Sequence, residues 1–226
     1  MISNSKFILI KSGLYMKKVK DMLSKDEIRK TCKTLLKKHS IRAFKRDFSV
    51  FKEIKHIIKE KKAKNVLIYI PLDYEINLFR FRKNLSKTCN LFVPFMQDKS
   101  LKIVKLRLPL YKKRFGILEP FKSDLNLKID LAVVPVIAVD KNLKRIGHGK
   151  GFYDMFFSNL TYKPLVVFIQ SLDLFYNENL TQKQDVRADY FINPYKKYFK
   201  KEFSNVNNIL HIYSRYHRRG DRIFSC

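Results

Sequence analysis

The sequence contains little cysteine and no long apolar run, and each shortage excludes a class of protein. Its three cysteines, Cys32, Cys89 and Cys226, are odd in number and far apart. This spacing argues against a disulfide framework or a zinc site and indicates reduced thiols, as in a cytoplasmic protein. The longest apolar run, 131–139, is broken by a proline and is too short to cross a bilayer. The apolar stretch 7–10 is shorter still and has no cleavage pattern behind it, so we expect no secretion signal.

Acidic residues are also scarce. The chain has 226 residues, with 48 Lys and Arg against 20 Asp and Glu, which gives a net charge of +28. This excess favours partners rich in phosphate or carboxylate groups, nucleic acid included. Hydrophobic residues make up 46% and aromatic residues 14%, which excludes a disordered chain although 30% of the residues are charged. The length suffices for one α/β domain or two small domains with a buried core.

No internal repeat and no linker rich in Gly, Ser or Pro divides the chain. We therefore expect one α/β domain at 23–205. The preceding segment, 1–22, has little hydrophobic periodicity and is expected to be a weakly ordered extension. The last segment, 206–226, is expected to be a basic extension because several arginines cluster there.

Two amphipathic helices are expected near the start of this domain. Ser24-Lys-Asp-Glu27 is a Ser-x-x-Glu capping box, and the apolar residues after it recur at helical spacing. A second helix is expected at 44–62. The predicted apolar faces contain Ile28, Cys32, Leu35 and Leu36 in the first helix, and Phe48, Phe51, Ile54 and Ile58 in the second.

Short apolar segments rich in β-branched residues predict the strands. Fully apolar runs suit the centre of a parallel sheet that is covered on both faces. With helices between them, they predict an α/β fold: an open, mainly parallel sheet with helices on both faces, as in a Rossmann-like layered sandwich. Ligands of such sheets bind beyond the carboxyl ends of the strands. The predicted strands are 66–70, 91–95, 131–134 and 165–168, with a strand nearer the edge at 101–108 and a helical stretch at 79–86.

The most informative segment is 140–154, which follows the central apolar run. Three alternate glycines in 147–151 leave backbone N–H groups uncovered, and Arg145 and Lys150 add positive charge beside them. A helix that begins near Tyr153 would add the positive end of its dipole. Together these features predict a cradle for a polyphosphate.

Other interpretations of the same segment remain open. A flexible glycine turn with solvated lysines has the same composition. Neither familiar nucleotide motif is present, because no Gly-x-x-x-x-Gly-Lys-Ser/Thr occurs and the third glycine falls one residue early for Gly-x-Gly-x-x-Gly. Asp154, just past the cradle, could serve as a magnesium ligand, since Mg²⁺ takes one or two carboxylates together with phosphate oxygens. A helix-capping charge is the alternative for this residue.

The run Arg145-Ile-Gly-His-Gly-Lys-Gly-Phe-Tyr-Asp154, preceded by Val134-Pro135 and by Asp140, resembles the signature of the 5-formyltetrahydrofolate cyclo-ligases, also called 5,10-methenyltetrahydrofolate synthetases. The resemblance extends in order over about 25–194. The departures from the family pattern remove no charge and none of the three glycines in 147–151, so we expect altered packing with the chemistry kept. The departures are Val136 for Gly, Val139 for Phe and Phe152 for Tyr.

Two further segments resemble parts of the family's binding site. Lys25 and Arg29 match basic residues that reach the ATP phosphates, and their spacing places both on one helix face near its positive end. A solvated helix face is the alternative for this pair. Glu75 matches a glutamate that contacts the folate, and a carboxylate suits the paired N–H donors of a pterin ring. An ordinary carboxylate at a helix start is the alternative for Glu75.

The resemblance also assigns residues in two later segments. The segment 115–120 is similar to a family segment that we expect to form a wall of the substrate pocket. Asp185 matches the family's second magnesium ligand, and Asp189 is expected to position the following strand. From the sequence alone, a charge that faces solvent is the favoured interpretation of either aspartate.

The activity implied by the resemblance is the cyclisation of 5-formyltetrahydrofolate to 5,10-methenyltetrahydrofolate, with ATP as co-substrate and Mg²⁺ as cofactor. It proceeds through a phosphorylated formyl intermediate and releases ADP and phosphate. The implied catalytic residues are Arg145 and Lys150, the folate-binding residues are Glu75 and Tyr153, and the metal ligands are Asp154 and Asp185. The implied ATP-binding residues are Lys25, Arg29, Arg145, Gly147, His148, Gly149, Lys150, Gly151, Phe152 and Tyr153. His148 could alternatively act as a general base, although the family varies at this position.

The implied partners are 5-formyltetrahydrofolate, with or without a polyglutamate tail, and ATP. The net charge of +28 would attract such a tail. We expect a cytoplasmic monomer that binds no membrane and no nucleic acid. The rival hypothesis is a nucleic-acid-binding protein without catalytic activity, since basic residues interleaved with Tyr and Phe suit backbone contact and base stacking. A relative that binds nucleotide without turnover is a third possibility.

Overall fold

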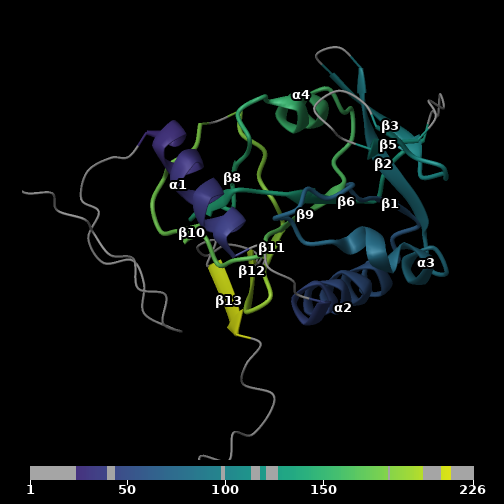
Figure 1. The fold of residues 1–226 in the computed structure, drawn as a ribbon, viewed down its shortest axis with the longest axis horizontal. Coiled ribbons are helices and arrows are strands. Elements are labelled where there is room, and N and C mark those ends of the chain that lie inside the picture. Colours follow the sequence, from purple (N-terminus) through teal and green to yellow (C-terminus); the bar gives the residue numbers. More distant parts are fainter. Residues whose placement is uncertain are drawn as a thin grey trace, which may run out of the picture.

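The computed structural model describes residues 24–39, 44–97, 100–112, 118–120, 127–182, 184–200 and 210–214. Its main sheet has eight strands in the order β13-β12-β11-β9-β6-β1-β2-β3 (Figure 1). The five strands from β11 to β2 are mutually parallel, whereas β3 at one edge and β12 and β13 at the other are antiparallel to their neighbours. The strands are β1 (Asn65–Leu67), β2 (Asn90–Gln97), β3 (Ser100–Lys105), β6 (Leu131–Pro135), β9 (Leu165–Ile169), β11 (Tyr190–Ile192), β12 (Lys196–Lys200) and β13 (Leu210–Ser214).

Two smaller sheets accompany the main one. The first has the order β10-β7-β8, and the second pairs β4 with β5. The first of these matters for function because β8 leads directly into the glycine segment. The strands of the smaller sheets are β4 (Tyr111–Lys112), β5 (Leu118–Glu119), β7 (Ala138–Asp140), β8 (Arg145–Ile146) and β10 (Phe175–Tyr176).

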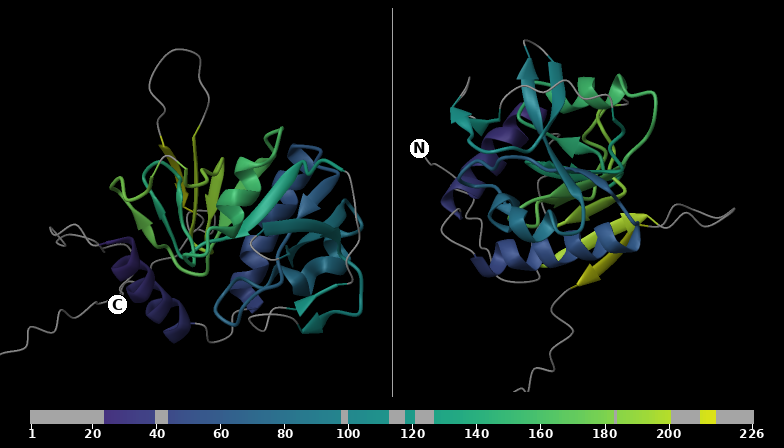
Figure 2. Two further views of the ribbon diagram at one scale, coloured as in Figure 1. Left: turned by 90° about the horizontal axis from the view of Figure 1, so that it is seen from above. Right: turned by 90° about the vertical axis from the view of Figure 1, so that its right-hand side faces the viewer.

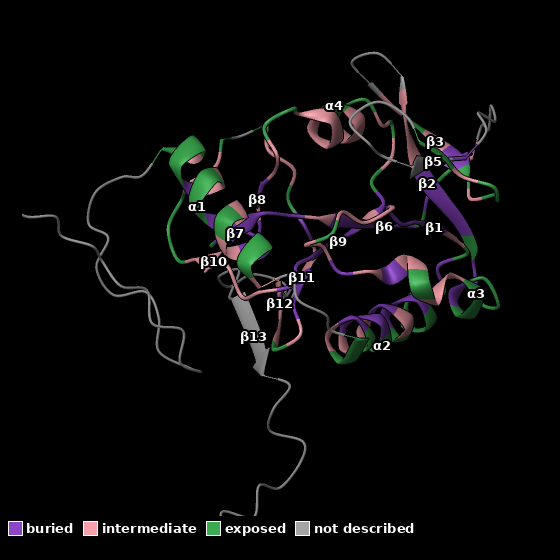
Figure 3. Ribbon diagram, in the orientation of Figure 1, coloured by how far each residue is buried: buried purple, intermediate pink, exposed green. Residues whose placement is uncertain are grey.

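The helices cover both faces of the main sheet, and the strand residues show why. Neighbouring residues of each central strand point to opposite faces. Val66, Leu131 and Val133 accordingly belong to a core cluster with α2, whereas Leu67 and Ala132 belong to a second cluster that packs against α4. The strands are buried on both sides, and the outer face of α2 is exposed (Figure 3). The helices are α1 (Lys25–Lys38), α2 (Phe44–Glu60), the 3-10 helix η1 (Leu78–Phe81), α3 (Arg82–Leu85) and α4 (Phe152–Ser158).

Helix α1 lies away from the main sheet and packs on the small sheet that contains β7 and β8 (Figure 2). The capping box at its start is present, because the Ser24 hydroxyl accepts from the Glu27 N–H and the Glu27 carboxylate accepts from the Ser24 N–H. Its buried face consists of Ile28, Cys32 and Leu36, which contact Ile137, Ala138 and Ile146. This packing brings the N-terminal turn of α1 to the glycine segment.

The predicted α/β fold with a mainly parallel sheet is confirmed, with corrections to its details. Phe48 was expected on the buried face of α2 but is 39% exposed, and Val50 and Ile57 are buried instead. The first strand ends at Leu67 rather than at residue 70, although the Ile68 N–H still donates to the Phe92 carbonyl of β2. Among the described helices, none is long and apolar enough to span a membrane.

Some expectations fall where the structure gives limited information. The segment 1–22 and residues 115–117 lie outside the described residues. Strand β13 falls within the expected extension 206–226, and its backbone pairs with β12 over Leu210–Ser214. The limits of the domain stay a prediction.

Candidate functional site

The glycine segment connects β8 to α4. We expected it to follow the central strand, but β6 ends at Pro135 and the chain first forms the antiparallel pair β7-β8. Gly149 and Gly151 have φ values of +97° and +69°, in the left-handed region that favours glycine. Helix α4 begins at Phe152 directly after this turn, with Gly151 as its N-cap. The phosphate loop, defined here as 147–151, therefore has the backbone conformation that its glycines predict.

Arg145 is the central cation of the site. Its side chain is only 6% exposed, and its Nε and Nη2 donate to Oδ1 and Oδ2 of Asp154 at 3.1 and 2.7 Å. The guanidinium also lies over the Tyr153 ring, 5.1 Å from its centre. A Cβ at Gly147 would stand 3.2 Å from the guanidinium carbon, so a glycine allows this close approach.

The two predicted cations of α1 reach the same rim by different contacts. Lys25 forms an ion pair with Asp185, while Arg29 Nε donates to the Gly147 carbonyl at 3.0 Å. Arg29 is also paired with Asp26 on its own helix. Both side chains are partly buried in these contacts, and their role toward ATP stays a prediction.

The two predicted metal ligands lie on this rim as well. The Asp154 carboxylate accepts from the backbone N–H of Val186, the residue after Asp185, at 3.2 Å. Among the described residues, no group of three or more His, Cys, Asp or Glu side chains could hold a metal ion. Mg²⁺ needs only one or two carboxylates when phosphate oxygens and water complete its shell. The donor set therefore fits magnesium shared with a phosphate, in competition with Arg145 and Lys25.

Glu75 lies on the other side of the phosphate loop, in the segment after β1. Its side chain is 10% exposed, and Oε2 accepts from the Leu72 N–H at 2.9 Å. Burial raises the pKa of Glu75 to about 7, although the Leu72 hydrogen bond acts in the opposite direction. The pKa of Tyr153 is raised by burial and then by the negative charge of Glu75, so the two predicted folate-binding residues share one region.

His148 is the one side chain of the phosphate loop that turns toward Glu75. Its Nε2 lies 4.0 Å from Glu75 Oε1 and 2.7 Å from the hydroxyl of Tyr74. Burial, with the positive charges of Lys33 and Arg145, lowers the pKa of His148 to about 4. The imidazole is therefore neutral near pH 7. Tyr74 was not predicted as a site residue, and the only signal for it in the sequence is its position before Glu75.

The remaining predicted residues lie in different parts of the structure. Lys150 is exposed at its tip, and Phe152 is half-buried in the first turn of α4. Asp189 accepts from the Val166 N–H at 2.8 Å, so it connects β9 to the start of β11 as expected. Of the segment 115–120, Pro120 is buried, and its place as a pocket wall stays a prediction.

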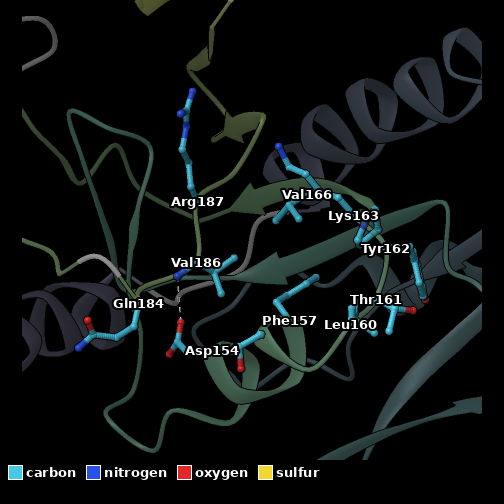
Figure 4. A pocket seen from close by; sticks show the side chains of 12 residues that line it. Asp154, Phe157, Leu160, Thr161, Tyr162, Lys163, Val166, Gln184, Val186 and Arg187 are labelled. Carbon is cyan, nitrogen blue, oxygen red and sulfur yellow. Dashed lines mark hydrogen bonds between the residues drawn. The ribbon is translucent and has the colours of Figure 1, made fainter.

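A cavity of about 500 Å³ adjoins Asp154 on the side of α4 (Figure 4). Its wall includes the aromatic rings of Phe157 and Tyr162 and the cations Lys163 and Arg187, which suit an anionic ligand with a flat apolar part. Sequence reasoning did not find this cavity, because its wall joins the end of α4 to the separate segment 184–187. It is lined by Asp154, Phe157, Ser158, Leu160, Thr161, Tyr162, Lys163, Pro164, Val166, Gln184, Val186 and Arg187.

Comparison with known proteins identifies relatives over the part of the chain that contains α1, Glu75 and the phosphate loop. The family model described as the 5-formyltetrahydrofolate cyclo-ligase family matches residues 21–173, which is more than half of the chain. The 5-formyltetrahydrofolate cyclo-ligase of Haemophilus influenzae is 28% identical over 128 residues, which cover 52% of this chain and 68% of that protein. The cyclo-ligase of Mycoplasma genitalium is 27% identical over 141 residues, covering 60% of this chain and 76% of the relative.

The fold has close counterparts among solved structures. The 5,10-methenyltetrahydrofolate synthetase of Aquifex aeolicus superposes with a TM-score of 0.68 at 23% identity, covering 86% of this chain and 99% of that one. The 5,10-methenyltetrahydrofolate synthetase of Mycoplasma pneumoniae gives a TM-score of 0.57 at 18% identity, over 76% and 99% of the two chains. These structures share the fold, and the family match carries the identification. The chain belongs to the 5-formyltetrahydrofolate cyclo-ligase family, a family of ATP-dependent ligases.

Proposed function

We propose that this protein converts 5-formyltetrahydrofolate to 5,10-methenyltetrahydrofolate, with MgATP as co-substrate and ADP and phosphate as products. The observation that carries the proposal is the convergence of Arg145, Arg29 and Lys25 on one rim of a glycine loop, with the buried Glu75 on its other side. A phosphate cradle beside a carboxylate without a cation suits a reaction between a polyphosphate and a ligand rich in N–H donors.

The chemical need for ATP follows from the substrate. The formyl oxygen is a poor leaving group, so it first attacks the γ-phosphorus, and the bond to the β-phosphate oxygen breaks to release ADP. N10 then attacks the activated formyl carbon. The carbon–oxygen bond breaks with loss of inorganic phosphate, and the N10 proton is released, which leaves the methenyl bridge.

The residues around the phosphate loop would act by position and charge. Phosphoryl transfer depends on alignment and on stabilisation of charge at the transferred group. In this proposal Arg145 and Lys150 contact the transferred phosphoryl group, and Lys25 and Arg29 hold the remaining phosphates. The N–H groups of the loop orient them, and no side chain acts as a covalent nucleophile.

Glu75 and Tyr153 would hold the folate. An ionised Glu75 accepts from the paired N–H donors of the pterin ring, and those donors replace the water lost on burial. The raised pKa of Glu75, about 7 in the free enzyme, is then expected to fall when folate binds.

Magnesium would be held by Asp154 and Asp185, and it would offset negative charge on the phosphates. In the described structure these carboxylates pair with Arg145 and Lys25. Once a nucleotide is bound, the same cations can pair with phosphate oxygens.

We further propose that the enzyme is a cytoplasmic monomer that accepts polyglutamylated folate. The net charge of +28 supports the polyglutamate tail because it favours carboxylate-rich substrates. The free, buried thiols of Cys32 and Cys89 suit a reducing cytoplasm.

The test is a direct assay of the purified protein with 5-formyltetrahydrofolate and MgATP, which follows the near-ultraviolet absorbance of the methenyl product. Absorbance should rise with MgATP and stay flat without ATP or with EDTA. Lys150→Ala should raise the KM for ATP, and Lys59→Ala, an exposed cation on α2 outside both the loop and the cavity, serves as the matched control. A folded protein that forms no product and binds no ATP would contradict the proposal. Salt-sensitive binding to single-stranded RNA in its place would support the nucleic-acid hypothesis.

A further inference from the structure

Tyr74 joins the two halves of the site, although the proposed reaction assigns it no part. Its hydroxyl lies 2.7 Å from His148 Nε2, which places the side chain between the Glu75 segment and the phosphate loop. Its carbonyl accepts from the Ser171 hydroxyl at 3.1 Å, and Ser171 is fully buried. The ring packs against the cluster that α1 forms with β7 and β8. Tyr74 is thus held at its backbone and at its ring, while its hydroxyl points to the loop.

His148 is suited to receive this contact. Its side chain is 34% exposed, and its ring centre lies 6.1 Å from that of Tyr74. A neutral imidazole has one N–H donor and one lone pair, and a tyrosine hydroxyl can complement either of them. The Tyr74 hydroxyl therefore fixes the ring whichever tautomer is present.

The phosphate loop needs such an anchor because glycines supply most of it. On the side of α1, Arg29 holds the Gly147 carbonyl. On the side of Glu75, the contact between the His148 side chain and the Tyr74 hydroxyl connects the loop to the segment that contains Tyr74 and Glu75. Since Glu75 Oε1 lies 4.0 Å from the same nitrogen of His148, a displaced ring would change the space in which the pterin end of a folate is bound.

We infer that Tyr74 is a positioning residue. Through its contact with His148, it sets the distance between the phosphate loop and Glu75, the carboxylate that is proposed to bind the folate. This inference rests on the proposed function. Arg29 still holds the loop at Gly147 when the Tyr74 contact is lost, and Glu75 holds the non-reacting end of the substrate. The effect therefore falls on folate binding more than on ATP binding.

The test compares Tyr74→Phe, His148→Ala, His148→Gln and the double variant Tyr74→Phe/His148→Ala. Tyr74→Phe should raise the KM for 5-formyltetrahydrofolate about three- to ten-fold, as expected for one lost hydrogen bond. The KM for ATP and kcat should stay within about two-fold of the wild type. The double variant should be no worse than His148→Ala, since both changes remove the same contact. His148→Gln, which keeps a hydrogen-bonding group near this position, should restore part of the loss.

Tyr176→Phe is the matched control. It also removes one hydroxyl from a tyrosine that packs on the same cluster, but that hydroxyl contacts the Cys32 sulfur at 3.3 Å and not the loop. Thermal unfolding of every variant separates positioning from a loss of fold. A merely structural role would change both KM values and the unfolding temperature together.

The outcomes distinguish this inference from the proposed function. An inactive, folded wild-type enzyme overturns the function, and the inference with it. An active wild type with an unchanged folate KM in Tyr74→Phe, or with additive losses in the double variant, overturns the inference alone.

Discussion

The carboxylates on the two sides of the site have opposite environments. On the phosphate side, Asp154 receives two hydrogen bonds from Arg145, and Asp185 is paired with Lys25. On the side proposed to bind folate, Glu75 is nearly buried and its Oε2 accepts from one backbone N–H. Among the described residues, its ion-pair contact is with His148 at 4.0 Å, and that histidine is neutral near pH 7.

This difference indicates what each side is suited to bind. A cation that is paired with a carboxylate can leave it and pair with a phosphate when that ligand binds. The ion pairs on the rim therefore keep Arg145 and Lys25 in position for an anionic ligand. A buried carboxylate without a cation is unfavourable until a ligand supplies N–H donors. Charge pairing on one side and desolvation on the other therefore favour two chemically different substrates in one site.

Removing the central cation should have the largest effect. Arg145→Ala should lower turnover by about 1,000-fold, because the charge at the transferred phosphoryl group loses its buried partner. It should also lower the free energy of unfolding by about 2 kcal/mol, since Asp154 is left unpaired. Steady-state assays and denaturant unfolding measure the two effects. Arg145→Lys, which keeps the charge without the paired donors, should fall between the wild type and Arg145→Ala.

The metal role of the rim can be separated from its pairing role by Asp154→Asn. We expect turnover to fall about 100-fold and the magnesium concentration for half-activation to rise. Stability should change less than in Arg145→Ala, because an asparagine oxygen can still accept from the guanidinium. Activity titrated with MgCl₂ at saturating ATP is the measurement. An unchanged magnesium requirement would show that Asp154 serves only to hold Arg145.

The folate side can be examined through Glu75→Gln. This change should raise the KM for 5-formyltetrahydrofolate about ten-fold, since an amide is a weaker acceptor than a carboxylate. In the wild type this KM should increase as the pH falls through about 7, where Glu75 takes up a proton. The variant should lack that dependence. A wild-type KM that stays flat between pH 6 and 8 would contradict the assigned titration.

The same carboxylate makes a prediction about stability. The folded enzyme holds the Glu75 proton more tightly than the unfolded chain, because burial raises its pKa from 4.5 to about 7. Its stabilising contribution is complete below about pH 4.5 and is lost as the pH rises through 7. Glu75→Gln should therefore match the wild type at pH 4 and exceed it at pH 8 by about 2 kcal/mol in the free energy of unfolding.

The smallest effect is expected at Gly151. Gly151→Ala should lower the free energy of unfolding by about 1 kcal/mol, because its φ of +69° is strained for alanine. Its Cβ meets no atom within 4 Å, so activity should stay within about three-fold. Gly147→Ala is the informative contrast, since its Cβ would press on the Arg145 guanidinium at 3.2 Å. It should lower turnover more than stability, whereas the opposite order would mean that Arg145 tolerates displacement.

Much of this architecture could be predicted because it depends on local patterns. Fully apolar runs such as 131–134 identify buried parallel strands, and the capping box at Ser24 identifies the start of α1. Phe48 was misplaced because helical spacing alone does not say which apolar residues a neighbouring element covers. Strand β7 was merged with the central run for the same reason, since periodicity does not show where a chain changes sheet.

The sequence by itself determined the class of fold, the glycine turn before α4 and the family, because these depend on residue order and short-range spacing. Only the tertiary structure decided which groups face one another across the site. Lys25 meets Asp185 from 160 residues away, and Tyr74 meets His148 from 74 residues away. Such contacts follow from how α1 and the segment after β1 pack on the small sheet. Burial is likewise decided by the tertiary structure. The pKa of Glu75 is raised because the folded chain removes water from its carboxylate, and the neighbouring residues in the sequence do not determine that burial.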